Sequence, residues 1–358
     1  MSEPESVGDI EFDGTLGEYT VIALGNLLFT VATLGIYRFW GTTRLRRYLW
    51  SRTIFMGERL EWSGTGQELF KGAMTAFVVV LVPIAVINFG VRELVLHGHR
   101  IAATVISVVE FIAFYTLVGA AAFRALRYRL SRTAWRGICG GSADPGLRYS
   151  AAYVWKNALG IATGGVMLPW AMVSLWNQRW NAMSFGSWPF VAQGRVRGLR
   201  LRFLVCYLAP ALGFLAARFL WRSGVVVTYF GVVPTTLAGR ILIMLPAVFG
   251  FLFVFLLICM AYYACFFRQM AGTTTLGTVE FRFTAGVMEW MELYVGDVVL
   301  VVATLGLGVI FLGYRHWRFY LRYAQIEGSV DFAALAQSSI AAPRQGEGLL
   351  DAFDMGAL

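Results

Sequence analysis

The stretch NLLFTVATLGIYRFW, residues 26–40, decides how this chain is interpreted. It begins with an apolar run, passes through Leu-Gly and ends among aromatic and basic residues. Its core phrase VATLGI (31–36) returns as VATLGL (302–307), and the same offset of 271 positions aligns much of the surrounding sequence. The aligned pairs include Asn26 with Asp297, Gly35 with Gly306, Arg44 with Arg315 and Arg47 with Arg318. The chain therefore contains a repeated structural unit.

A fainter middle copy lies at an offset of 130 positions, with Gly35 on Gly165, Trp40 on Trp170 and Trp50 on Trp180. Each of the three units is predicted to contain a strand-like stretch, a broken apolar helix, an amphipathic aromatic helix and a closing strand, so that a short β-hairpin forms. The amphipathic helix is strongly basic in the outer two copies. The predicted helix breaks, which serve either a turn or close packing, are Gly35, Gly165 and Gly306.

The composition is that of a membrane protein. Hydrophobic residues make up 58% of the 358 residues and charged residues only 14%, against about 25% charged residues in a soluble domain. The apolar residues fall into blocks close to the roughly 20 residues that a helix needs to cross the hydrocarbon core. We therefore predict an α-helical polytopic membrane protein with about seven hydrophobic segments. They are 19–37, 72–91, 101–123, 157–178, 203–217, 241–267 and 298–314.

Units and apolar segments alternate along the chain. The predicted organisation is an acidic N-terminal tail (1–9), repeat unit 1 (10–66), helix pair 1 (70–123), repeat unit 2 (127–195), helix pair 2 (200–267), repeat unit 3 (274–335) and a flexible C-terminal tail (336–358). Residues 1–18 are acidic, which is the reverse of a secretory signal peptide. We therefore expect the first hydrophobic segment to direct membrane insertion.

Two membrane arrangements fit these segments. If all seven cross with the N-terminus outside, 21 Lys and Arg lie inside and 9 outside. If the apolar helix of each repeat unit dips into the membrane and returns, or lies at its surface, the division is 25 against 5. The second arrangement obeys the positive-inside rule better. It also requires the glycine breaks to be buried in protein, because exposed non-helical backbone is excluded from lipid.

Several stretches resemble the YjgN family of bacterial inner-membrane proteins, a domain of unknown function. They are FDGTLGEY (12–19), NLLFTVATLGIYRFW (26–40), RLRRY (44–48) and WSGT (62–65), with EFRFTAG and VATLGL in the third copy. The resemblance implies repeated units between hydrophobic segments, a multi-pass location in the bacterial inner (plasma) membrane and no established reaction. It also suggests an M48-type membrane metallopeptidase as a partner, because family members often occur beside one. The middle copy departs from the pattern with ATGGVMLPW.

Two groups of side chains are candidate sites. Glu110 is a candidate ligand or proton site, together with Asn88, because a carboxylate within an apolar segment is costly and usually functional. Pairing of Glu110 with a neighbouring arginine is the structural alternative. The arginines of the amphipathic helices alternate with aromatic residues, which is typical of interfacial helices that bind lipid phosphates. These candidates for lipid-headgroup or anion binding are Arg44, Arg46, Arg47, Arg315, Arg318 and Arg322.

The motifs of several function classes are missing from the sequence. It contains no HExxH, GxSxG or P-loop and no Cys/His ligand spacing, so we expect no catalytic activity, no cofactor and no metal. It shows no known nucleic-acid-binding module. Two functions remain open. One is transport, or interaction with lipid or a small ligand, with membrane lipids, including anionic ones, as partners. The other is a non-catalytic scaffold that binds a protein such as the M48-type peptidase.

Overall fold

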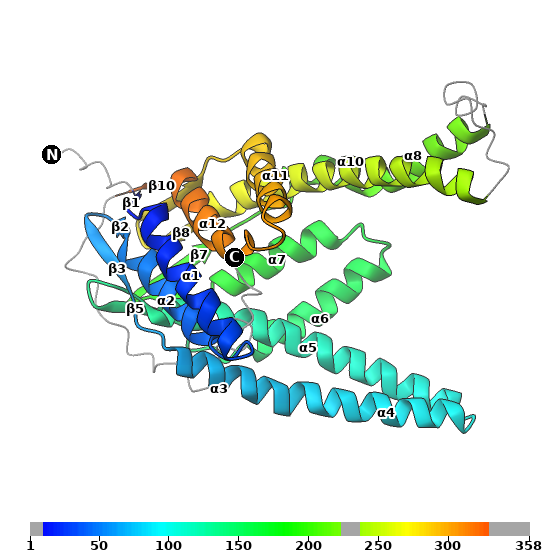
Figure 1. The fold of residues 1–358 in the computed structure, drawn as a ribbon, viewed down its shortest axis with the longest axis horizontal. Coiled ribbons are helices and arrows are strands. Elements are labelled where there is room, and N and C mark those ends of the chain that lie inside the picture. The colour runs from blue at the N-terminus through cyan, green and yellow to red at the C-terminus, as the bar shows by residue number, and fades with distance from the viewer. Residues whose placement is uncertain (1–9, 223–236, 329–358) are drawn as a thin grey trace.

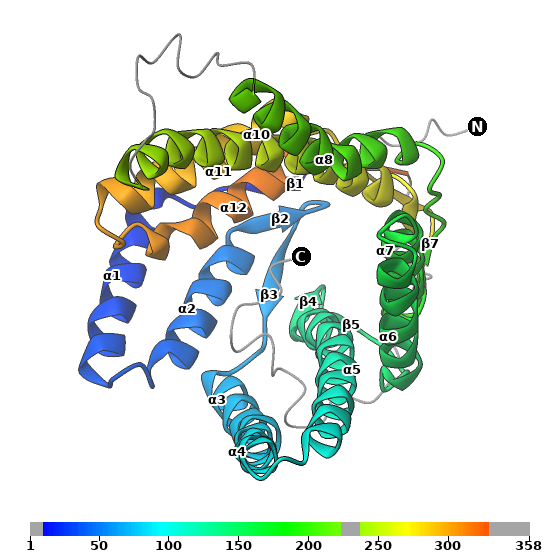
Figure 2. The same cartoon turned by 90° about the vertical axis from the view of Figure 1, so that its right-hand side faces the viewer.

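The computed structural model describes residues 10–222 and 237–328. The predicted tails at 1–9 and 336–358, and the last residues of unit 3, lie outside this range. Within it, ten strands alternate with five helix pairs, and the helix pairs project away from the sheet, several of them toward the same side (Figures 1 and 2).

The strands form one sheet in which each pairs antiparallel with its neighbour in the chain. They are β1 (Ile10–Phe12), β2 (Thr53–Phe55), β3 (Glu58–Trp62), β4 (Thr133–Trp135), β5 (Ile138–Gly141), β6 (Ser184–Phe185), β7 (Trp188–Ala192), β8 (Thr274–Leu276), β9 (Val279–Phe283) and β10 (Ala324–Glu327). The first and last strands also approach each other, so the sheet curls almost into a barrel. This approach places the two edge strands beside each other, where they are less open to pairing with other chains.

Two-residue turns explain why the strands pair locally. Met56 and Gly57, between β2 and β3, have φ angles of 50° and 78°. Arg136 and Gly137, between β4 and β5, have φ angles of 52° and 75°. Positive φ at both central residues is the geometry of a type I′ turn, whose twist matches that of the flanking strands. These two hairpins are therefore specified by their own short sequences.

The helix pairs have two lengths. The short pairs are α1 (Leu16–Ala32) with α2 (Arg38–Ser51), α6 (Leu147–Ala162) with α7 (Leu168–Trp180), and α11 (Val287–Ala303) with α12 (Val309–Tyr323). The long pairs are α3 (Gly66–Ala76), the π-helical η1 (Phe77–Leu81) and α4 (Val82–Leu96) with α5 (Arg100–Arg132), and α8 (Arg200–Arg222) with α10 (Leu237–Ala271). In Figure 2 the α4–α5 pair is seen nearly end on, whereas α1, α2, α11 and α12 are seen lengthwise. These two short pairs therefore run across the direction of the α4–α5 pair.

The repeated phrase encodes the turn of each short pair. Thr33 Oγ1 donates to the Phe29 carbonyl (2.7 Å) and accepts from the Tyr37 amide (2.9 Å). Gly35 has a φ of 92°, and its amide donates to the Thr30 carbonyl at 2.7 Å. The equivalent residues are Thr163 and Gly165 in the middle pair and Thr304 and Gly306 in the last, with glycine φ angles of 98° and 95°. Because this φ range favours glycine, the phrase reverses the chain at all three sites.

Four helices among the described residues are long and apolar enough to cross a membrane. They span 66–96, 100–132, 200–219 and 248–271. The predicted segments 19–37, 157–178 and 298–314 are instead divided by the glycine turns, and their first helices contain only 16 or 17 residues. Four of the seven predicted segments are therefore continuous membrane-length helices among the described residues, and a glycine with positive φ follows the first helix in each of the other three.

The single sheet argues against seven single crossings of the bilayer. Seven crossings would place β1 and β2 on opposite sides of the bilayer, and likewise β5 and β6, and β9 and β10. These strands are hydrogen-bonded neighbours. Both ends of every helix pair therefore lie at the same sheet, and the described strands do not fit seven single crossings.

The strands within the bounds of the three predicted units join one sheet rather than three small ones. They include β4 and β8, which directly follow the long helix pairs and lie inside the bounds of units 2 and 3. Inside the sheet, an apolar cavity of about 170 Å³ is lined by aromatic residues such as Phe55, Trp135 and Phe190. Between sheet and helices, Tyr19, Trp50 and other buried aromatic residues form the main core cluster.

Candidate functional site

One polar contact joins the two helices of every short pair at the same position. The contacts are Asn26 with Arg44 (3.4 Å), Lys156 with Ser174 (2.8 Å) and Asp297 with Arg315 (2.7 Å), and the partners are 18 positions apart each time. The glycine of the turn lies midway between them. The first partner is buried in each pair, with exposed fractions of 6% for Asn26 and 7% for Lys156 and Asp297. Because buried polar groups require hydrogen-bond partners, these contacts hold the helices in register.

The chemistry of this contact differs between the copies. Asp297 accepts from Arg315 Nε through Oδ1, and its Oδ2 lies 2.6 Å from His316 Nε2. In the middle copy the cation is on the first helix, where Lys156 donates to Ser174 and to Gln178 at 2.9 Å. The middle copy, which lacks the dense arginines of the outer copies, thus keeps the polar contact but has its cation on the first helix instead of the second.

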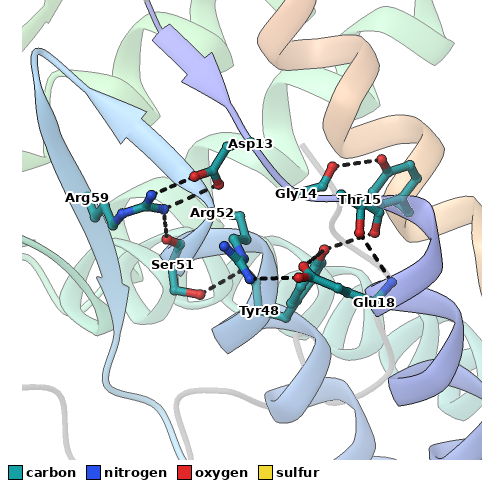
Figure 3. Close-up of polar contacts among 9 residues, drawn as sticks. Asp13, Gly14, Thr15, Glu18, Tyr48, Ser51, Arg52 and Arg59 are labelled. Atoms are coloured by element: carbon teal, nitrogen blue, oxygen red, sulfur yellow. Dashed lines mark hydrogen bonds and ion pairs between the residues drawn. The ribbon is translucent and has the colours of Figure 1, made fainter.

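A second network attaches the α1–α2 pair to the sheet (Figure 3). Arg59 of β3 binds both carboxylate oxygens of Asp13, with Nη1 to Oδ1 at 3.2 Å. These hydrogen bonds from Arg59 lower the pKa of the Asp13 carboxyl below its usual range. On the same face, Glu18 accepts from Arg52 at 2.9 Å and from Tyr48 at 3.0 Å. The network sets the position of α1.

The same arrangement recurs at the base of the first long pair and links neighbouring pairs. Glu68 of α3 accepts from Arg132 at 2.8 Å and from Tyr128 at 3.2 Å. Tyr314 of α12 donates to the Gly14 carbonyl at 3.0 Å, just before α1. This bond connects residues at opposite ends of the chain and places α1 beside α12 (Figure 1).

A groove of about 630 Å³ lies between α1 and the α11–α12 pair. Near the turn it is lined by Leu300 and Phe311, and near the sheet by Arg318 and Arg322 of α12 and Glu292 of α11. These three charged side chains are exposed. The groove therefore runs from an apolar end to a charged end.

The charged groups in the groove fall into two classes. Arg315 is engaged by Asp297, and Glu289 accepts the Gly286 amide (2.9 Å) as part of the N-terminal cap of α11. The second class consists of side chains that form no hydrogen bond or ion pair with another described residue. These residues are Arg318, Arg322 and Glu292. Two guanidinium groups and one carboxylate thus remain available to a ligand.

The structure separates the six arginines that were predicted to bind headgroups. Arg315, Arg318 and Arg322 line the groove. Arg44 contacts Asn26 and donates to the Tyr37 hydroxyl at 3.1 Å, and Arg47 is exposed on α2. Arg46 is only 9% exposed, and its guanidinium lies 5.2 Å from the Trp62 ring centroid. Arg46 therefore lies against the protein core, unlike the exposed Arg47 on the same helix.

The two polar candidates within the long helices lie together. Asn88 of α4 donates to Glu110 of α5 at 2.7 Å and to the Ile84 carbonyl at 2.9 Å. Asn88 is exposed and Glu110 partly so, which leaves the pair on the outer surface of the α4–α5 pair. The described partner of Glu110 is thus an amide and not the neighbouring arginine considered above. Neither residue lines the groove.

Sequence reasoning missed Lys156, Ser174, His316 and Glu292. The offset of 130 positions places Lys156 on Asn26 and Ser174 on Arg44, so the internal alignment could have found that contact. No comparable signal marks Glu292, because its role depends on the packing of α11–α12 beside α1.

Comparison with known proteins shows the family to which this chain belongs. The family model described as "Bacterial protein of unknown function (DUF898)" matches residues 8–352. The chain belongs to this family. Two relatives named "Inner membrane protein YjgN" each match this chain over 127 residues, which is 36% of this chain and 29% of the relative. The relative from Salmonella typhimurium is 28% identical and the one from Escherichia coli O157:H7 is 27% identical. The namesake of Escherichia coli K12 is 37% identical over 63 residues, or 18% of this chain and 16% of the relative.

This DUF898-family chain therefore aligns with less than a third of the length of each of these relatives. No solved structure matches it. The resemblance to the YjgN family is confirmed. Together with the four apolar helices, the names of the relatives identify a multi-pass protein of the bacterial inner membrane.

Proposed function

We propose that this DUF898-family protein binds phospholipid in the groove between α1 and the α11–α12 pair. One observation carries the proposal: Leu300 and Phe311 line one end of the groove, and the exposed Arg318 and Arg322 line the other. This gradient matches an amphiphile whose acyl chain lies among apolar side chains. Guanidinium groups bind phosphate oxygens through paired, charge-assisted hydrogen bonds.

The orientation of the helices supports the same ligand. With the α4–α5 pair across the bilayer, α11 and α12 lie along its surface, because they run across the direction of that pair (Figure 2). A basic amphipathic helix such as α12 holds its charged groups at headgroup depth in this position. Arg318 and Arg322 would then face lipid phosphates.

The other two hypotheses from the sequence, transport and a scaffold function, are not based on the groove. The transport hypothesis relied on Glu110. Glu110 and its hydrogen-bond partner Asn88 both lie outside the groove. A scaffold for an M48-type metallopeptidase stays a prediction, and a pull-down with that peptidase as bait would test it. Phospholipid binding has the stronger physical basis, because several independent groups converge on one groove.

The experiment compares lipid retained by the purified wild type and by Arg318→Gln/Arg322→Gln, measured by mass spectrometry after a standard detergent wash. A basic residue near a lipid surface contributes about 1 kcal/mol, so losing both should weaken binding by about thirtyfold. The matched control is Arg195→Gln/Arg197→Gln, which removes two exposed arginines outside the groove. Equal retention by both double variants would refute the proposal.

A further inference from the structure

We infer that the groove selects a phospholipid with a primary ammonium in its headgroup, with Arg318 and Arg322 on the phosphate and Glu292 on the ammonium. This inference rests on the phospholipid site proposed above and adds the class of lipid. It follows from three charges that lie at one level of the groove without neutralising one another.

The register of α11 and α12 sets that level. The contact between Asp297 and Arg315 aligns the two antiparallel helices at one point. Glu292 lies five positions before Asp297, so it is level with the residue five positions after Arg315, which is Tyr320. Arg318 and Arg322 lie on either side of that residue. Glu292 is therefore level with the segment between Arg318 and Arg322 on the facing helix, and all three side chains line the groove.

These opposite charges do not meet. No ion pair joins Glu292 to Arg318 or Arg322, although all three line the same groove. The other charged residues of the groove are already used, Arg315 by Asp297 and Glu289 by the cap of α11. Opposite charges that flank a space without closing it attract a ligand that carries both signs.

A zwitterionic headgroup satisfies all three groups at once. Its phosphate accepts from the guanidinium N–H groups, and its primary ammonium donates to the carboxylate. A glycerol headgroup supplies only hydroxyls to Glu292, and a choline headgroup has no N–H with which to donate. The arrangement therefore favours phosphatidylethanolamine over phosphatidylglycerol.

The test exposes full-length wild type, Glu292→Gln and Arg318→Gln/Arg322→Gln to vesicles of equal phosphatidylethanolamine and phosphatidylglycerol. Retained lipids are counted by mass spectrometry. The wild type should be enriched in phosphatidylethanolamine. In Glu292→Gln, total lipid should change less than twofold, while the ratio of the two lipids falls about fivefold, as expected for one exposed charge interaction. The control Glu61→Gln, an exposed carboxylate on β3 outside the groove, should match the wild type.

The outcomes separate the two claims. If the arginine variant loses lipid but Glu292→Gln keeps the wild-type ratio, the headgroup selectivity is refuted and the phospholipid site stands. If the arginine variant retains both lipids, the site itself is refuted and the inference fails with it. Glu292 is exposed, so its substitution by the similarly sized glutamine leaves folding intact.

Discussion

Removal of the Asp297 carboxylate should reveal how strongly the polar contact holds a short helix pair. Asp297 is 7% exposed and contacts both Arg315 and His316. The internal repeat offers a natural comparison, because the equivalent residue in the first pair is Asn26, whose side-chain oxygen contacts Arg44. Asp297→Ala removes the acceptor altogether, whereas Asp297→Asn imitates the first copy.

The two substitutions should differ in size. Breaking a buried ion pair by removing one partner costs about 3–5 kcal/mol of unfolding free energy. The Arg315 side chain is 35% exposed, so water can partly solvate it, and we expect the lower end, about 3 kcal/mol, for Asp297→Ala. Asp297→Asn keeps one acceptor and should cost about 1 kcal/mol. At roughly 2 °C per kcal/mol for a chain of this size, the Tm should fall by about 6 °C and 2 °C.

The assay is thermal unfolding of the purified variants in one detergent, followed by the circular dichroism of the helices. Glu61→Gln is the control, because it changes an exposed carboxylate outside the groove and should leave the Tm unchanged. Equal losses for Asp297→Ala and Asp297→Asn, or no loss for either, would show that Asp297 does not hold α11 and α12 in register.

Two further predictions concern the glycine turns and the topology. Gly35→Ala should destabilise the protein by about 1–2 kcal/mol, because an L-residue is strained at its φ of 92° although no atom blocks the new methyl group. Gly25→Ala, at an equally open position within α1, should raise the free energy of unfolding by up to about 1 kcal/mol, and a matching loss of Tm in both variants would contradict this reasoning. A reporter enzyme inserted after Gly194 should be active in the cytoplasm, because all strands lie on one side of the bilayer and the positive-inside rule places that side inside; periplasmic activity would exclude this topology.

Local features of the fold could be predicted from the sequence because they depend on neighbouring residues. The glycine breaks at Gly35, Gly165 and Gly306 lie in turns with one backbone shape, since each turn is closed by hydrogen bonds within a few residues. The strand pieces likewise pair across two-residue turns such as Met56-Gly57. Long apolar runs identified the membrane helices on length and hydropathy alone.

The candidate site was only partly predictable. The arginines of α12 were recognised by their alternation with aromatic residues, but Arg46, with the same pattern, is buried against Trp62. Periodicity cannot show which face of a helix meets a neighbour that is distant in sequence. Glu292 and the groove depend on such a neighbour, because α1 reaches α12 through the bond from Tyr314 to Gly14, across 300 positions.

The sequence by itself determined that apolar helices hold this chain in a membrane. It also determined the positions at which a repeated phrase reverses the chain, since both features follow from interactions within one segment. Only the tertiary structure decided that ten strands join one sheet, that both ends of each short pair lie at that sheet, and that Glu292 lines the same groove as Arg318 and Arg322. Those features arise from contacts between segments far apart in the chain, and many pairings are compatible with the same local pattern until the whole sheet closes.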